Sequence, residues 1–220
     1  MNDRLEEQKR YYAARAPEYD DWWYRRGRYE LEPDALGRWQ ADVLEVDAAL
    51  EAFAPRGNVL ELAAGTGIWT RKLVRLAERV VAVDANAETL ALNTPEADLI
   101  QADVFAWKPK PGETFDVVFF SFWLSHVPEQ RFEEFWRFVR TCLAPGGRVF
   151  LVDNAAGGES THGLRSGEET ETRTLADGRT FEIVKLRRTA EELRARVAPF
   201  GITLDLRLTA NGYFLYGLGS

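Results

Sequence analysis

Residues 59–70 read VLELAAGTGIWT, and this stretch decides the fold. Its apolar run is typical of a buried strand, and the run ends in a loop that carries Gly65 and Gly67. Glycine at a strand end lets the backbone approach a ligand where a side chain would collide. An isolated acidic residue, Glu61, precedes the loop. The stretch predicts a strand, a glycine loop and a helix start that together seat a ligand.

The rest of the chain repeats this alternation of apolar runs with amphipathic segments. Strands are expected at 58–64, 80–85, 97–103, 115–125 and 148–154, and helices at 68–80, 86–94, 128–147 and 189–201. Alternating strands and helices imply right-handed crossovers and a parallel sheet. Residues 202–220 add two strands that turn at Asn211-Gly212. The predicted fold is α/β: a doubly wound, seven-stranded Rossmann-like sheet with an antiparallel C-terminal hairpin.

Two regions flank this core. Residues 1–57 are rich in aromatic side chains and are expected to form a helical N-terminal lid. Residues 58–220 then form the ligand-binding domain, with 155–188 as a loop and hairpin insertion that turns at Asp177-Gly178. In a doubly wound sheet, ligands bind beside the carboxyl ends of the strands.

Composition narrows the classes of partner. The formal net charge of −7 over 220 residues argues against nucleic acid or an anionic membrane as partner, since phosphate backbones require clustered Lys and Arg. One cysteine and two histidines offer no disulfide and no metal-ligand cluster, so no metal is expected. The sequence shows no signal peptide and no apolar stretch of membrane-spanning length, so a cytoplasmic location is expected.

The glycine loop departs from two familiar patterns. A dinucleotide fingerprint requires a third glycine where this chain has Thr70, which speaks against an NAD(P)-dependent oxidoreductase. A phosphate-binding loop requires Gly-Lys-Ser/Thr, which does not follow. The loop therefore favours a nucleoside ligand without phosphate.

Five segments, in order, resemble a known family. They are ELAAGTG, VVAVDAN, QADVFAW, FDVVFFSFWLSHVP and LAPGGRVFLVDN. Over roughly residues 58–153 the chain resembles a class I S-adenosylmethionine (SAM)-dependent methyltransferase. The resemblance implies SAM as cofactor and methyl transfer as the reaction.

The resemblance also implies roles for particular residues. Asp84 would hold the ribose hydroxyls, Asp103 would lie near the adenine amine, and Glu61 would help to hold the methionine ammonium. The whole set expected at the cofactor is Tyr11, Tyr19, Glu61, Gly65, Thr66, Gly67, Asp84, Ala85, Asp103, Val104 (or Phe105) and Ser121. Each acidic residue also has a structural reading, as a helix cap or a solvated strand end.

The acceptor side is less defined. His126 and His162 are the candidate general bases, because an ordinary imidazole pKa of about 6.5 suits proton transfer at neutral pH. Both could instead shape the site. Lid aromatics such as Trp22 and Trp23 could line the acceptor pocket, whereas the run Arg25, Arg26 and Arg28 is interpreted as a solvated charged surface.

The substrate expected from these features is a small molecule methylated on O, N or C. DNA amino-methyltransferases carry an Asp/Asn-Pro-Pro-aromatic segment after the fourth strand, and this chain has SFWLSHV at 121–127 instead. The alternatives are a SAM-binding protein with chemistry other than methyl transfer and, less favoured, an NAD(P)-dependent oxidoreductase.

Overall fold

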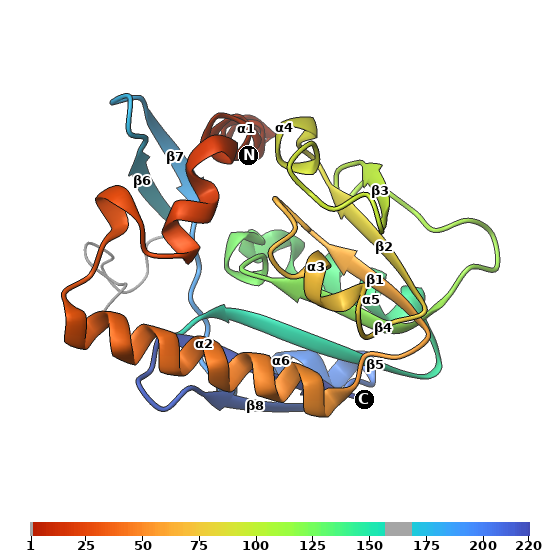
Figure 1. The fold of residues 1–220 in the computed structure, drawn as a ribbon. Helices are drawn as coiled ribbons and strands as arrows, with labels where there is room; N and C mark the ends of the chain where they lie inside the picture. Colours follow the sequence, from red (N-terminus) through yellow and green to blue (C-terminus); the bar gives the residue numbers. More distant parts are fainter. Residues whose placement is uncertain (1, 157–168) are drawn as a thin grey trace.

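The computed structural model describes residues 2–156 and 169–220. Its centre is a seven-stranded sheet of order β3-β2-β1-β4-β5-β9-β8 (Figure 1). Five strands run parallel, and β9 is antiparallel to both its neighbours. The strands are β1 (Asn58–Leu62), β2 (Arg79–Asp84), β3 (Asp98–Gln101), β4 (Phe115–Ser121), β5 (Leu143–Asn154), β8 (Leu204–Leu208) and β9 (Phe214–Gly219). The predicted fold class is confirmed.

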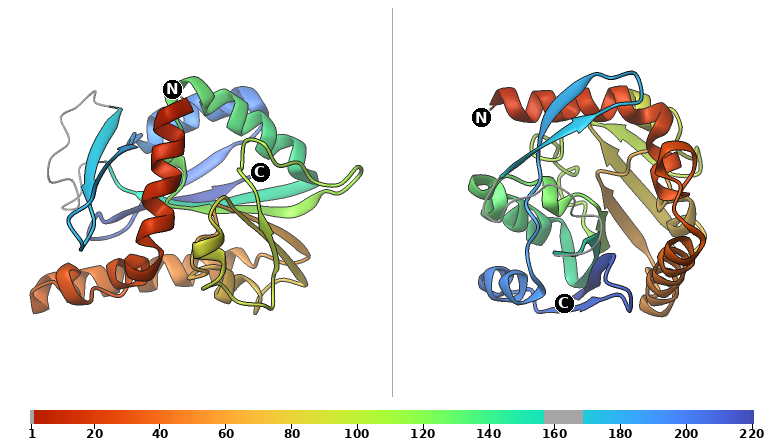
Figure 2. Two further views of the ribbon diagram at one scale, coloured as in Figure 1. Left: turned by 90° about the horizontal axis from the view of Figure 1, so that it is seen from above. Right: turned by 90° about the vertical axis from the view of Figure 1, so that its left-hand side faces the viewer.

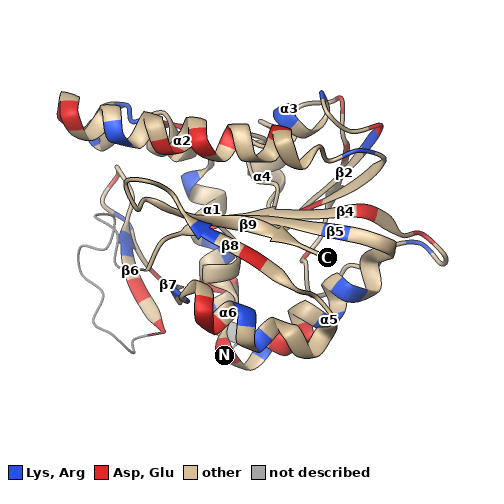
Figure 3. Ribbon diagram, turned by 90° about the horizontal axis from the view of Figure 1, so that it is seen from below, with Lys and Arg blue, Asp and Glu red and all other residues tan. Residues whose placement is uncertain are grey.

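Helices cover both faces of this sheet (Figure 2). The apolar core is divided between the two faces, and the central strand β4 is buried on both, with Val118 and Phe119 fully enclosed. One face packs α2 (Pro33–Phe53) and α3 (Thr70–Leu73), and the other packs α5 (Phe132–Cys142) and α6 (Ala190–Val197). Acidic side chains lie in the first turn of both α5 and α6 and basic side chains lie in the last turn, so the outer faces of these helices are polar (Figure 3).

The N-terminal segment is helical, as expected. It comprises α1 (Asn2–Trp23), the 3₁₀ turn η1 (Gly27–Tyr29) and α2. The buried carboxylate of Asp42 on α2 accepts hydrogen bonds from Thr209, Asn211 and Tyr213, so it fixes the turn between β8 and β9. α1 lies between α4 (Ala87–Leu90) and β7 (Thr180–Val184) and contacts both (Figure 1).

A small second sheet supports α1 from the other side. It is the hairpin of β6 (Thr170–Thr174) and β7 (Thr180–Val184), and it turns at Gly178, whose φ is 87°. Tyr11 of α1 packs with Leu175 and Ile183 of this hairpin. The hairpin insertion expected from the sequence therefore acts as a support for the N-terminal helix.

The helices after β1 and β2 and the strand β4 are shorter than the sequence predicts. The helices after β1 and β2 end at Leu73 and Leu90, because past the capping residues Val74 and Ala91 the next two amides bond three residues back rather than four. β4 ends at Ser121 because Phe122 takes a left-handed φ of 50° and donates its amide to Val152. These turns lie at the carboxyl ends of the strands, where the pockets open.

Candidate functional site

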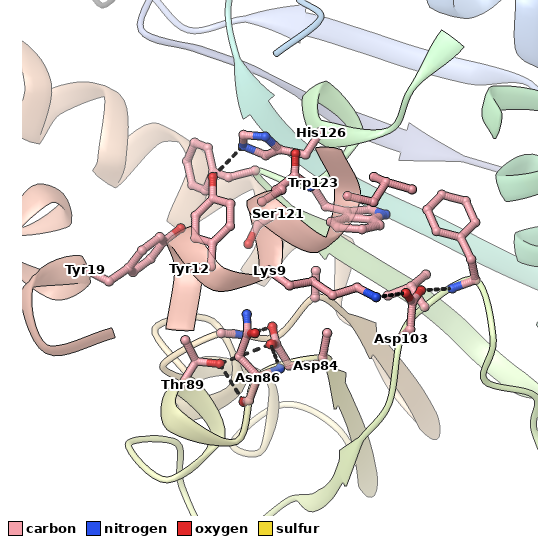
Figure 4. A pocket seen from close by; sticks show the side chains of 18 residues that line it. Lys9, Tyr12, Tyr19, Asp84, Asn86, Thr89, Asp103, Ser121, Trp123 and His126 are labelled. Atoms are coloured by element: carbon pink, nitrogen blue, oxygen red, sulfur yellow. Dashed lines mark hydrogen bonds and ion pairs between the residues drawn. The ribbon is translucent and has the colours of Figure 1, made fainter. Parts of the chain in front are cut away.

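A pocket opens between α1 and the carboxyl ends of β1 to β4 (Figure 4). It encloses about 780 Å³, including the open space at its mouth, which suits a ligand of cofactor size. We call it the cofactor pocket. Of the residues expected at the cofactor or as bases, it is lined by Tyr19, Gly65, Asp84, Ala85, Asp103, Val104, Ser121 and His126, and also by Phe105.

The two loop glycines serve different purposes. Gly65 has a φ of 56°, and a Cβ placed there would meet nothing within 4 Å, so its open side faces the pocket. At Gly67 a Cβ would lie 2.1 Å from Oδ1 of Asn93, so a side chain is excluded by packing. Between them, Thr66 donates its hydroxyl to Asp20 of α1, which ties the loop to the N-terminal helix.

Asp84 ends β2 with its carboxylate fixed by neighbouring donors. Oδ2 accepts the amide of Gly65 at 2.9 Å, while Oδ1 accepts the amide of Asn86 at 2.9 Å and the hydroxyl of Thr89 at 3.1 Å. Each carboxylate oxygen has about two acceptor sites. The capacity left for a ligand is therefore on Oδ2.

Asp103 follows β3 and joins the pocket to α1. Its Oδ1 accepts the amide of Phe105 at 2.8 Å, and its Oδ2 lies 2.6 Å from Nζ of Lys9. Val104 is buried, and Phe105 packs against Trp123 with ring centroids 5.9 Å apart. This segment thus presents a carboxylate beside apolar side chains, an arrangement suited to a flat heterocycle with a polar edge.

Glu61 lies behind the pocket rather than in its lining. Its side chain is 1% exposed, and Oε2 has no hydrogen-bond partner among the residues described. Burial raises the pKa of this carboxyl to about 8, against the effect of the Thr70 hydroxyl, which lowers it. A buried polar atom without a partner marks a place where a ligand or a water is needed.

His126 lies in the 3₁₀ turn η2 (Leu124–His126) after β4 and is 4% exposed. Its Nδ1 is 2.7 Å from the carbonyl oxygen of Val184, and its Nε2 is 2.7 Å from the hydroxyl of Tyr12 (Figure 4). Burial lowers the pKa of the ring well below 6.5, and nearby Lys185 lowers it further. The ring is therefore neutral near pH 7.

A second pocket of about 430 Å³, open space at its mouth included, adjoins the first. It is lined by Tyr12, Arg15, Tyr19, Trp22, Phe122, His126, Asn154, Arg173 and Lys185. Because three of these residues are cationic and none is acidic, we call it the cationic pocket. It shares Tyr12, Tyr19, Phe122 and His126 with the cofactor pocket. A molecule in one pocket would therefore meet a molecule in the other at these four residues.

Arg15 is a buried cation of this pocket without a carboxylate partner among the described residues. It is 9% exposed, Nε has no hydrogen-bond partner, and no carboxylate of the described residues forms an ion pair with it. Its guanidinium instead lies 5.1 to 5.9 Å from the ring centroids of Tyr11, Tyr19, Trp22 and Tyr29. A buried charge without a counter-charge is costly, so this arrangement favours an anionic ligand.

Lys185 lines the same pocket, follows β7 directly, and is 3% exposed. Nζ donates to Oγ of Ser125 at 2.8 Å and to Oδ1 of Asn154 at 2.9 Å. Burial lowers its pKa to about 8, although Asp153, 4.0 Å away, raises it. Nζ also lies 3.5 Å from Nε2 of His126, so the ammonium is linked to the histidine that lines the same pocket.

The expected arginine run lies elsewhere. Arg25 stacks over Trp39 at 3.3 Å from the ring centroid, Arg26 pairs with Asp21, and Arg28 pairs with Glu18. None of the three lines the cofactor pocket or the cationic pocket. Arg26 and Arg28 are exposed, as interpreted from the sequence, whereas Arg25 is part-buried against Trp39, so the interpretation as a solvated surface is wrong for Arg25.

Comparison with known proteins identifies the family. A model of a methyltransferase domain matches residues 59–147. DhpI, solved in a SAM-HEP complex, is 38% identical over 99% of this chain and 97% of its own, with a TM-score of 0.80. The chain belongs to the class I SAM-dependent methyltransferases. Its cofactor is SAM. A second structure of DhpI, in a complex with SAH, is 38% identical over 100% of this chain and 98% of its own, with a TM-score of 0.78.

Two further proteins are more distant from this methyltransferase. The glycopeptide N-methyltransferase MtfA, with SAH bound, is 18% identical over 80% of this chain and 85% of its own, with a TM-score of 0.59, which shows a shared fold. An uncharacterized methyltransferase of Anoxybacillus flavithermus is 30% identical over 102 residues. That match covers 45% of this chain and about half, 48%, of the relative.

Several expected residues of the methyltransferase lie outside the two pockets. Tyr11 packs on the β6–β7 hairpin, whereas its neighbour Tyr12 faces both pockets. Thr66 lines a small adjoining recess with Tyr19, and Gly67 contacts Asn93. His162 lies outside the described residues.

In the part of the chain that the structure covers, no cluster of three potential metal ligands occurs, and no helix there has the length and apolarity to span a bilayer.

The residues missed by the sequence analysis are Lys9, Tyr12, Arg15, Arg173 and Lys185. They come from α1 and from the β6–β7 hairpin, outside the five family segments. The sequence offered only a weak indication of these residues. Lys185, for example, follows the apolar strand residues Ile183 and Val184, and a lysine at the end of a hairpin strand is common.

Proposed function

We propose that this methyltransferase transfers the SAM methyl group to an acidic small molecule held in the cationic pocket. The observation that carries the proposal is Arg15, a buried cation whose pocket holds no carboxylate and adjoins the cofactor pocket. The pocket size suits a small ligand. Nucleic acid is disfavoured by the net charge of −7.

The proposed cofactor contacts follow from the pocket lining. Asp84 would accept a hydrogen bond from a ribose hydroxyl through Oδ2. Asp103 would accept a hydrogen bond from the adenine amine while its carboxylate stays paired with Lys9. Gly65 leaves open space for the backbone to approach the methionine portion. When bound, SAM supplies a methyl group on a positively charged sulfur. The residues fit this cofactor because Oε2 of Glu61 is buried without a partner and the Asp84 carboxylate lines the pocket with Gly65.

The chain itself contributes alignment and exclusion of water. Arg15 and Lys185 would both bind the acid group, and side chains of α1 line both pockets. Holding reactants in attack geometry can supply ~7–11 kcal/mol of a barrier. An acidic acceptor also carries its nucleophilic oxygen already ionised, so a base is not required.

A matched acceptor screen tests the substrate class. Small carboxylates, phosphonates and phosphate monoesters are compared with their uncharged amides or full esters, and SAH release is measured. HEP is a rational first compound, since DhpI was solved with it. We expect turnover of acids and none of the uncharged partners. Equal turnover of both members of the pairs would contradict the proposal.

Titration of Lys185 should make acceptor use depend on pH. The group is protonated below its pKa of about 8 and loses its charge above it. We therefore expect kcat/KM for the acid acceptor to fall by about tenfold per pH unit above pH 8, because this ratio reports the free enzyme. In Lys185→Met the ratio should be lower and flat over this range. A wild-type profile that stays level to pH 9.5 would exclude Lys185 from acceptor binding.

Binding of SAM should release protons from Glu61. At pH 7 a carboxyl with a pKa of about 8 is largely protonated, and a cation brought near it lowers that pKa. Calorimetric titration in buffers of different ionisation enthalpy should show up to about one proton released. Glu61→Gln should abolish the release. Release of equal size in that variant would assign the proton to another group.

A further inference from the structure

Tyr12 stands where the two pockets meet. It projects from α1 and lines both the cofactor pocket and the cationic pocket (Figure 4). Its hydroxyl lies 2.7 Å from Nε2 of His126, which is its one hydrogen-bond partner among the residues described. The side chain that faces both ligand sites is thus tied to the histidine at the end of β4.

The backbone fixes the tautomer of His126. Nδ1 lies 2.7 Å from the carbonyl oxygen of Val184, and because a carbonyl only accepts, Nδ1 must carry the hydrogen. The charged groups that face the ring are Lys185, Arg173 and Arg15, and with burial they hold its pKa well below 6.5. The neutral ring therefore presents the lone pair of Nε2 to the Tyr12 hydroxyl at 2.7 Å, while Nζ of Lys185 lies farther from the same nitrogen, at 3.5 Å.

This tautomer determines what Tyr12 offers to the pockets. Burial raises the pKa of the phenol well above 10, so the hydroxyl keeps its hydrogen and donates it to Nε2. Both lone pairs of the phenol oxygen are then free at the junction of the pockets. Such an oxygen can accept weak C–H···O contacts from an electron-poor methyl group.

We propose that Tyr12 is a catalytic residue that aligns the reacting groups through its hydroxyl oxygen, and that His126 is a positioning residue which holds Tyr12 and takes no proton from the acceptor. The inference rests on the proposed function, because an ionised acceptor oxygen has no proton to give. The hydroxyl hydrogen of Tyr12 stays on the phenol oxygen and remains hydrogen-bonded to Nε2 before and after methyl transfer.

Nitrogen NMR of histidine tests the protonation of the pair without turnover. The chain has two histidines, so ¹⁵N-histidine labelling with a His162→Ala variant assigns His126. We expect the Nδ1–H tautomer to persist between about pH 5.5 and 8.5, the range in which an ordinary histidine titrates. In Tyr12→Phe the Nε2 signal should shift. An Nε2–H tautomer, or a protonation midpoint near 6.5, would overturn the inference.

Kinetics of matched variants test the alignment. Tyr12→Phe should lower kcat by ~10²-fold, the scale of a misplacement of about 1 Å. His126→Asn keeps a donor for the Val184 carbonyl but removes Nε2, and its kcat should fall less. The double variant should be no slower than Tyr12→Phe alone, because each of the two substitutions removes the same hydrogen bond between Tyr12 and His126. Tyr24→Phe removes a hydroxyl from an exposed tyrosine and should be neutral.

The outcomes separate this inference from the proposed function. If His126 were a base, His126→Asn would be slower than Tyr12→Phe, and wild-type kcat would fall tenfold per unit below the histidine pKa. Either result would overturn the inference while acids remain the substrates. Turnover of uncharged acceptors in the screen would instead contradict the proposed function and would leave the NMR result standing.

Discussion

Arg15→Met is expected to raise the KM of an acid acceptor by ~10–150-fold, the range for losing a hydrogen bond to a charged group. Arg15 is buried, has no carboxylate partner among the described residues and lines the cationic pocket, so its charge has no other evident counterpart. The Kd of SAM should change by less than about twofold, because separate sites act independently. Initial rates on the best acid from the screen, with calorimetry for SAM, measure both effects.

Two further variants of α1 sharpen this result. Arg15→Lys keeps the charge but loses the planar fork, so its KM should lie between those of wild type and Arg15→Met. Arg10→Met removes an exposed arginine from the same helix and should leave both constants unchanged. A folded Arg15→Met protein with wild-type KM would show that the acid group binds elsewhere.

Asp84→Ala is expected to weaken binding of SAM and SAH by at least ~10-fold and up to ~150-fold, for the same physical reason. The carboxylate is nearly buried and has one acceptor site left on Oδ2. Calorimetric titration with each ligand measures the loss, and circular dichroism verifies the fold.

The size of the Asp84 effect has a structural component. The carboxylate also holds the amide of Gly65, so its removal loosens the glycine loop. Asp84→Asn keeps the size and one acceptor oxygen, and should retain more affinity than Asp84→Ala. Asp98→Ala, an exposed carboxylate at the far end of β3, is the control. Unchanged SAM affinity in a folded Asp84→Ala protein would contradict the ribose assignment.

The sequence predicted the sheet well because its signals are local. Apolar runs such as 115–121 are long enough to identify buried strands, and Gly-Thr-Gly at 65–67 marks the loop between β1 and α3. It was less successful with helix lengths. α3 and α4 end early because the backbone amides beyond their caps form hydrogen bonds to the i−3 carbonyl. No residue pattern in these segments predicts that change.

The sequence by itself determined the family and its cofactor, because the residues expected to surround SAM follow consecutive strands and stand in short motifs such as ELAAGTG and VVAVDAN. Only the tertiary structure decided which side chains form the cationic pocket. Tyr12 and Arg15 come from the first helix, and Lys185 comes from a hairpin some 170 residues later in the chain. Their meeting depends on α1 packing against β7, a long-range contact between segments with no shared periodicity or motif.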